Sequence, residues 1–334
     1  MPIKGLVPLI IDNPFEDPII PDRIKWSVSQ LKLFRKCKRK WFWKYALGLR
    51  PHYRASALMI GSAFHETLEQ WYGSKRSSMK KIVAKKTKEI EAEAIANCDY
   101  YDQAEYDKMM TLIKTLDGML IGYSKRYAAE RKKWNIIKDF IEAEAIVDLG
   151  EFDFHFKIDL LVKAAKKKAF LVEHKSAAII GDSYIERLPL DAQVRGYIFG
   201  ATHKKGFNVN VSDVIYDVVK KCKLRKKSNE LRDDFTARIA QDYIDRPEFY
   251  FVREKLKFNK GDIKAFEYEL RLTHAEWKYV IESAEDPLDP RCWCPSDNIC
   301  SEFFKTCPYQ VLCLRGLDRG SAHLFEQRVK EETK

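Results

Sequence analysis

The stretch EFDFHFKID at residues 151–159, followed by AFLVEHK at residues 169–175, decides the fold. In the first stretch apolar and polar residues alternate, which is the pattern of a half-buried strand ending at Asp159. The second stretch is also strand-like, and the lysines at 166–168 predict a solvated hairpin turn between the two. We therefore expect Asp159 and Glu173 to meet across a pair of strands.

Two carboxylates that face each other predict a site for a divalent cation. In a partly buried site they repel each other unless positive charge lies between them, and a hard cation such as Mg²⁺ prefers oxygen ligands. Lys175 lies on the same face as Glu173, because side chains alternate along a strand, and it could act on a nucleophile there.

Two helical stretches carry further polar residues. Residues 60–71 (IGSAFHETLEQW) predict a helix with His65 beside an apolar stripe, where a histidine alone is more often a core residue. Residues 190–201 (LDAQVRGYIFGA) predict a second helix that places Gln193 and Tyr197 on one face. Both side chains could contact a phosphate or a base.

Together these motifs resemble those of RecB-type nucleases in the PD-(D/E)XK superfamily. The matching motifs are GSAFH at 61–65, IDLL at 158–161, EHK at 173–175 and QVRGY at 193–197. The resemblance implies an α/β fold like that of restriction endonucleases, in which helices flank a mixed β-sheet. It also implies hydrolysis of DNA with Mg²⁺ or Mn²⁺.

The resemblance assigns a role to each matching residue. It implies metal ligation by His65, Asp159, Glu173 and the backbone carbonyl of His174, a catalytic role for Lys175, and a helix motif that closes the active site at Gln193 and Tyr197. One departure is Lys157, which stands where many relatives have glycine and concerns the local strand packing. Glu144, in an alternating stretch upstream, is a candidate first-strand acid near the site.

The cysteines indicate a second metal site. Five of the eight lie in the last part of the chain, and we expect reduced thiols because the first residues do not resemble a secretion signal. Clustered reduced cysteines are typically metal ligands, and zinc and an iron–sulfur cluster both accept four thiolates. Zinc sites usually contain two Cys-x-x-Cys pairs, and the cysteines at residues 292–313 include none.

The cysteine spacing resembles that of AddB-type nucleases and of CRISPR-associated RecB-like exonucleases. This resemblance implies a [4Fe–4S] cluster that joins the cysteine-rich segment at 292–313 to the N-terminal region through Cys37, Cys300, Cys307 and Cys313. Cys292 or Cys294 could replace one of these ligands. Cys98 and Cys222 are expected to be ordinary residues.

The charge balance agrees with a nucleic-acid partner. The chain has 60 Lys and Arg against 49 Asp and Glu, and the basic residues gather at 35–40, 80–88, 131–133 and 220–227. Such runs are usually solvated faces. The first run is different, because aromatic residues directly follow its cations. The cations could contact phosphates and the rings could stack on unpaired bases, so the candidate DNA-binding residues are Lys38, Arg39, Lys40, Trp41 and Trp43. The alternative is that these aromatic residues belong to the core.

We expect one nuclease domain over residues 1–334, with a helical insertion at 77–134 and the catalytic sheet and motif helix at 140–201. No Gly-Lys dipeptide is present, so the chain lacks the phosphate-binding loop of a helicase motor. The family resemblance favours a stand-alone cytoplasmic exonuclease of a phage or mobile element. It would act on DNA with single-stranded ends in recombination, replication or degradation, could work beside proteins of those processes, and would not bind a membrane. The alternatives are an endonuclease on branched or single-stranded DNA and a non-catalytic subunit that binds DNA ends.

Overall fold

The computed structural model describes residues 9–52, 56–96, 103–164, 168–302 and 305–328. Contacts divide the chain into a terminal unit (Met1–Tyr53, Ile146–Phe156 and Gly261–Lys334) and a central unit (Arg54–Ala145 and Lys157–Lys260). Cys98 and the turn lysines Lys166 and Lys167 lie outside the described residues. In the part that the structure describes, no helix is both long and apolar enough to cross a membrane.

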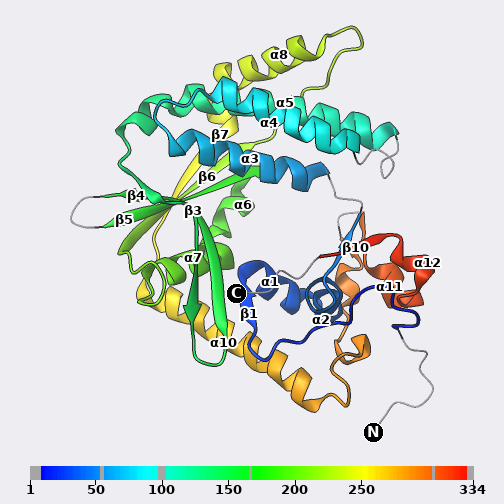
Figure 1. Ribbon diagram of the computed structural model, residues 1–334. Helices are drawn as coiled ribbons and strands as arrows, with labels where there is room; N and C mark the ends of the chain where they lie inside the picture. The colour runs from blue at the N-terminus through cyan, green and yellow to red at the C-terminus, as the bar shows by residue number, and fades with distance from the viewer. Residues whose placement is uncertain (1–8, 53–55, 97–102, 165–167, 303–304, 329–334) are drawn as a thin grey trace. The chain divides into compact units, whose positions relative to one another are not determined.

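The central unit is built on a mixed β-sheet. Its strands in chain order are β3 (Ile136–Asp148), β4 (Asp153–Lys163), β5 (Ala169–Ala177), β6 (Val211–Lys220) and β7 (Phe251–Leu256), of which β3 ends and β4 begins in the terminal unit. Strands β4 to β7 are neighbours in that order, and β3 pairs with β4. The β4–β5 and β6–β7 pairs are antiparallel, whereas β5 and β6 are parallel. The mixed sheet predicted from the sequence is thereby confirmed (Figure 1).

Helices flank this sheet. One apolar core joins it to α3 (Ser56–Gly73), α4 (Met79–Ala96), α5 (Gln103–Lys133) and α8 (Arg232–Asp245), which Figure 1 shows lying together on one face of the strands. The sheet contributes Leu160, Val162, Val172, Val219 and Phe251 to this core. After β5 come α6 (Asp182–Glu186) and α7 (Ala192–Thr202), and α7 packs against β6. Helices α4 and α5 occupy most of residues 77–134.

Strand alternation separates the polar residues of the sheet into two sets. Leu160 lies opposite Val172 in the β4–β5 pair, so the next pair outward brings Asp159 to the level of Glu173. Glu173 therefore shares its face of the sheet with Asp159, whereas His174 points to the other face. His174 lies beside Asp217 in the β5–β6 register.

The terminal unit combines residues from both ends of the chain. Its elements include β1 (Lys25–Ser27), α1 (Val28–Lys36), α2 (Lys38–Trp41), a π-helix (Phe42–Ala46), β2 (Leu49–Pro51), α10 (Lys260–Ser283), α11 (Gln310–Arg315), α12 (Arg319–Ala322) and β10 (Phe325–Gln327). Strand β1 pairs in parallel with the first residues of β4, and β2 pairs with β10. A cluster of aromatic rings forms its core, with Trp26, Phe34 and Trp293 fully buried.

Two glycines in α5 allow close approach of α8. A Cβ atom added at Gly118 would lie 2.5 Å from Cγ2 of Ile239, and one at Gly122 would overlap the Cβ atom of Tyr243. We therefore expect Gly122→Ala to lower the free energy of unfolding by about 1–3 kcal/mol through overpacking, as measured by urea denaturation. Gly61→Ala in α3 is the control, because no atom lies within 4 Å of its added Cβ. It should raise the stability by about 0.5–1 kcal/mol, and equal effects of the two changes would contradict the close packing.

Candidate metal and catalytic site

The two expected carboxylates lie side by side in the sheet, away from solvent. Asp159 at the middle of β4 is 8% exposed, and Glu173 on β5 is fully buried. Lys175, two residues further along β5, places its Nζ atom 2.5 Å from Oε1 of Glu173. The antiparallel β4–β5 pairing thus gathers three of the predicted residues without any contribution from a loop.

The charges of these groups depend on one another. Burial raises the pKa of Glu173, and the neighbouring Asp159 carboxylate raises it further. Burial alone would also raise the pKa of Asp159, but the charge and hydrogen bond of His65 lower it below its ordinary value. Burial lowers the pKa of Lys175, yet the two carboxylates outweigh this and raise it above its ordinary value. Asp159 is therefore ionised. For Glu173, the positive charge of Lys175 only partly offsets the effects of burial and of the neighbouring Asp159.

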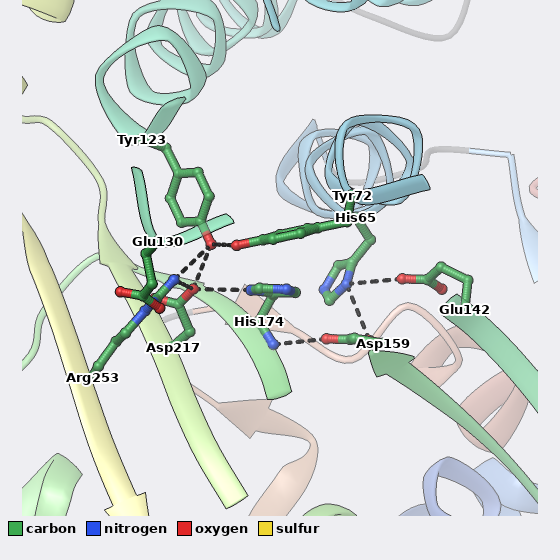
Figure 2. A network of polar contacts seen from close by, with 9 residues as sticks. All are labelled: His65, Tyr72, Tyr123, Glu130, Glu142, Asp159, His174, Asp217 and Arg253. Atoms are coloured by element: carbon green, nitrogen blue, oxygen red, sulfur yellow. Dashed lines mark hydrogen bonds and ion pairs between the residues drawn. The ribbon is translucent and has the colours of Figure 1, made fainter. Parts of the chain in front are cut away.

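A histidine and a third carboxylate border Asp159 (Figure 2). His65 of α3 places Nδ1 3.4 Å from Oδ1 of Asp159 and 3.7 Å from Oε1 of Glu142, which lies on β3. One ligand atom from each of these three residues lies within 4.8 Å of the others. On its other side, Glu142 Oε2 is 2.9 Å from the Nζ atom of Lys157.

Glu142 is the functional residue that the sequence analysis missed. Glu144 was the expected first-strand acid, but it is exposed, whereas only 12% of the Glu142 side chain is exposed. Glu142 has φ 49°, a left-handed conformation that is uncommon for a residue with a Cβ atom. Nothing in a strand with regular alternation signals such a local change. The lysine at 157, noted as a departure from the family pattern, is the cation that pairs with this carboxylate.

These residues fit a divalent cation. Both carboxylate oxygens of Glu173 are buried; the ammonium of Lys175 lies 2.5 Å from Oε1, and Oε2 has no hydrogen-bond donor among the described residues. Asp159 accepts a hydrogen bond of 2.7 Å from the backbone N–H of His174 through Oδ2, while Oδ1 faces His65. Buried acceptors without donors are costly unless a cation binds them. Carboxylates are the ligands that Mg²⁺ and Mn²⁺ prefer.

The charges of these carboxylates also act on the helix motif. Asp191 caps α7 by accepting a hydrogen bond from the N–H of Gln193 at 2.7 Å. One turn later, the side-chain amide of Gln193 donates a hydrogen bond of 2.6 Å to the hydroxyl of Tyr197. Burial raises the pKa of Tyr197, and the charges of Glu173 and Asp159 raise it further. The phenol is therefore neutral and lies within electrostatic range of both acids.

A buried polar network lies beside the site residues, on the far side of His174 (Figure 2). Nδ1 of His174 is 3.1 Å from Oδ2 of Asp217, a fully buried carboxylate on β6. Asp217 also accepts hydrogen bonds from Arg253 of β7 at 3.0 Å and from the hydroxyl of Tyr123 of α5 at 2.5 Å. Burial would raise the pKa of Asp217, but Arg253 and His174 lower it to about 2. Asp217 is thus a stable anion.

This network connects α3 to the catalytic strand. The hydroxyl groups of Tyr72 and Tyr123 are 2.8 Å apart, and the Tyr72 ring stacks on His174 with centroids 5.3 Å apart. Tyr72 and His65 are seven residues apart in α3, so they share one helix face. His174 stands between Glu173 and Lys175. The network therefore sets the position of α3 over β5, and with it the distance from His65 to Asp159.

The basic aromatic run at the N-terminal end is largely structural. Trp41 is 2% exposed and Trp43 is fully buried, so these rings belong to the core and the expectation that they stack on bases is wrong. Lys38 forms an ion pair of 2.8 Å with Glu276, and Arg39 donates hydrogen bonds to backbone carbonyls. The half-buried Lys40 bonds through its backbone N–H to the sulfur of Cys37. The rings are buried on more than one side of this segment, because Trp41, Phe42 and Trp43 are all covered.

The four proposed cluster cysteines all belong to the terminal unit, and their thiols influence one another electrostatically. Burial raises the pKa of Cys300, and the charges of Cys307 and Cys37 act in the same direction. Burial also raises the pKa of Cys313, where Cys37 and Cys307 again contribute. Cys307 and Cys300 are further linked by a backbone hydrogen bond of 2.8 Å.

The two alternative cysteines have other surroundings. Burial raises the pKa of Cys292, with contributions from nearby aspartates rather than from the other thiols. Cys294 is exposed. Cys222, in the central unit, bonds to the backbone N–H of Leu224.

The network behind the site yields a test of metal affinity. We expect Asp217→Asn to leave Arg253 without its buried counter-charge and to lower stability by about 3–5 kcal/mol. Because His174 then loses its anchor, Mn²⁺ affinity, measured by electron paramagnetic resonance of the free ion, should fall by about 10–100-fold.

Asp117→Asn is the matched control for this change. Asp117 is a buried carboxylate of the same unit, 7% exposed, which accepts a hydrogen bond from Thr87. It should lose stability and keep the Mn²⁺ affinity of the unmodified protein. If Asp217→Asn binds Mn²⁺ as tightly as the control does, the network does not position the site.

Comparison with known proteins agrees with this geometry. The sequence profile of the PD-(D/E)XK nuclease superfamily matches residues 25–313, which include all the site residues described above. Comparison with curated proteins gives no match. Enzymes of the superfamily hydrolyse phosphodiester bonds with divalent metals such as Mg²⁺ or Mn²⁺, and the carboxylates and lysine found here suit that chemistry. The chain therefore belongs to the PD-(D/E)XK nuclease superfamily.

Proposed function

We propose that this protein is a Mg²⁺- or Mn²⁺-dependent DNA exonuclease. The observation that carries the proposal is the buried pair of Asp159 and Glu173, with a lysine at 2.5 Å from Glu173 and a histidine at 3.4 Å from Asp159. The superfamily supports phosphodiester hydrolysis. The GSAFH and QVRGY motifs, which resemble those of RecB-type nucleases, favour the exonuclease form and DNA as the substrate.

The ligands of the cation would be His65, Asp159 and Glu142, whose ligand atoms lie within 4.8 Å of one another in this structure. Glu173 lies outside this group of three, and its role as a ligand, like that of the His174 carbonyl, comes from the resembling family. A bound divalent ion supplies a water of lowered pKa and neutralises charge on the scissile phosphate. The protein holds its ligands on rigid strands and on a helix fixed by the Tyr72 network. Little rearrangement is then required at the moment of reaction.

Lys175 and Tyr197 would act as hydrogen-bond donors. Burial lowers the pKa of Lys175, but Glu173 and Asp159 raise it more, so the amine is protonated at neutral pH and does not serve as a base. It can orient the attacking water and stabilise negative charge that develops on the phosphate. The neutral phenol of Tyr197, held by Gln193, can donate to a phosphate oxygen.

The catalytic prediction concerns single changes in the site. Asp159→Ala, Glu173→Ala and Lys175→Ala should each lower cleavage of end-labelled linear DNA by more than about 100-fold, and a double variant should be little worse than a single one. Lys163→Ala is the control, because Lys163 is an exposed lysine at the end of β4. Cleavage near the unmodified rate by Lys175→Ala would overturn the assignment.

The same assay distinguishes the alternatives. An exonuclease degrades linear DNA with Mg²⁺ or Mn²⁺ and leaves closed circular DNA intact, whereas nicking or linearisation of circles would support an endonuclease. A protein that binds DNA ends without cleaving them with either ion would be a non-catalytic subunit. The proposed setting, DNA recombination, replication or degradation in a phage or mobile element, rests on the family resemblance.

We also propose a [4Fe–4S] cluster on Cys37, Cys300, Cys307 and Cys313. Support comes from the mutual electrostatic influence of these thiols and from their common location in the terminal unit. A tetrahedral zinc site with bonds of about 2.3 Å brings its sulfurs within about 4 Å of each other. Among the described cysteines, no three sulfurs lie within 4.8 Å of one another. A cluster on these four cysteines would tie the two ends of the chain together.

The cluster prediction is spectroscopic. Protein purified without oxygen should be brown and contain about four irons per chain. Cys37→Ser should lose the iron and unfold at a lower temperature, because the metal bridges distant segments. Cys294→Ser is the matched control and should keep both. Colourless protein with stoichiometric zinc, or loss of iron in Cys294→Ser, would contradict this ligand set.

A further inference from the structure

A basic pocket of about 290 Å³ opens at the far end of β6 in the central unit. Its lining includes Lys220, Lys221, Lys223, Arg246, Phe249 and Tyr250. The lysines begin the basic run at 220–227, which the catalytic proposal leaves without a role. The two aromatic residues come from α9 (Pro247–Tyr250), which precedes β7.

The pocket holds positive charge that the described residues do not neutralise. Arg246 already binds Asp242 through two contacts, of 2.7 and 2.5 Å. Among the described residues, no carboxylate lies within 4.0 Å of the ammonium group of Lys220, Lys221 or Lys223. Burial lowers the pKa of Lys221, with no compensating charge. Bringing lysines together and partly burying one is unfavourable unless an anion binds there.

An aromatic ring fixes two of the cations. Nζ of Lys220 lies 3.6 Å from the ring centroid of Phe249, and the guanidinium of Arg246 lies 5.0 Å from the same ring. Phe249 is 48% exposed, which is unusual for so large an apolar side chain. Cation–π contacts hold the positive groups at the pocket without removing their charge. The cations are therefore already in place to bind an anion.

The strand register places the pocket near the catalytic strand. In the parallel β5–β6 pair, Lys175 lies opposite Val218, and Ala177 lies opposite Lys220. The Cα atom of Lys220 is thus two residues along and one strand across from that of Lys175, which corresponds to roughly 8 Å. Tyr250 and Leu224 pack with the apolar core on the other face, so the pocket lies at the end of β6 and not on the catalytic face itself.

We propose that this pocket binds a phosphate group of the nucleic-acid substrate close to the bond that is cleaved. The inference rests on the proposed nuclease function, which supplies a ligand with many phosphate groups. A strand bound at Lys175 would continue past the end of β6, where the pocket lies. A phosphate inside the chain and a phosphate at a strand end share the same chemistry, and the experiment distinguishes the two.

The test combines Lys220→Ala with Lys221→Ala. The matched control combines Lys132→Ala with Lys133→Ala, which removes the same charge from exposed lysines in the last turn of α5. Binding of internally labelled oligonucleotides is measured in EDTA between about 50 and 200 mM salt, so that cleavage does not interfere. The pocket variant should bind all sequences more weakly and flatten the dependence of log affinity on log salt by about 0.7 for each single-strand phosphate that the pocket no longer binds.

The strand end is varied in the same measurement. If 5′-phosphorylated, 3′-phosphorylated and unphosphorylated strands all bind more weakly to the pocket variant, the pocket binds a phosphate within the chain; weaker binding confined to one phosphorylated end assigns it to that terminal group. An unchanged salt slope, or equally weakened binding in the control variant, would overturn the proposal. Phe249→Leu removes the aromatic ring that contacts Lys220 and Arg246 but keeps an apolar side chain, so it should weaken binding to a smaller extent.

Failure of the pocket and failure of the nuclease proposal give different results. A thymidine nitrophenyl phosphodiester carries only the scissile phosphate and has no second phosphate for the pocket, so the unmodified protein and the pocket variant should hydrolyse it at equal rates with Mn²⁺. If neither hydrolyses it or DNA, the nuclease proposal fails, while the binding data still decide whether the pocket takes a phosphate. Unequal rates on this small ester would overturn the pocket proposal, because the lysines would then act at the catalytic site itself.

Discussion

The repulsion between two buried carboxylates is the constraint on which the central unit depends. Asp159 and Glu173 are brought together by the β4–β5 pairing, where solvent cannot screen their charges. A divalent cation bound between these carboxylates would relieve their repulsion, and metal-assisted phosphodiester hydrolysis uses a site of this kind.

The catalytic face is supported from the reverse face of the same strands. His174 lies between Glu173 and Lys175 in the chain and turns to the opposite side, where it contacts Asp217, which is itself paired with Arg253. Tyr72 links this arrangement to the helix that carries His65. Polar groups so deeply buried are favourable only when their hydrogen bonds are made, which restricts the helix and strands to one relative position. The geometry of the site is therefore set by the whole sheet and its covering helices.

The strand pair could be predicted from the sequence because alternation and turn residues are local signals. Glu173 and Lys175 were placed on one face by the two-residue period of a strand, and the structure has the same arrangement. The helix with His65 followed from apolar spacing. The proximity of Tyr197 to the acids needed the family resemblance, since a Gln and a Tyr one turn apart are common on helices.

Other features could not be predicted because their causes are not local. Trp41 and Trp43 follow cations in the sequence, but their environment is decided by partners such as Trp293, which lies far away along the chain. Asp217 did offer a signal, as an acid within the apolar strand VSDVIYDVVK, although its partner Arg253 could not be named without the β6–β7 register. Glu142 depends on a single backbone angle, for which a glutamate gives no indication.

At Glu142 the left-handed backbone lowers the stability of the fold, whereas the side-chain carboxylate contributes to the site. A residue with a side chain in this region carries strain of about 1–3 kcal/mol, whereas glycine adopts the same angle freely. Selection for stability alone would replace this glutamate, and the carboxylate next to His65 would then be lost. A descendant of this chain released from selection for cleavage would be expected to lose Glu142 early and to gain stability by doing so.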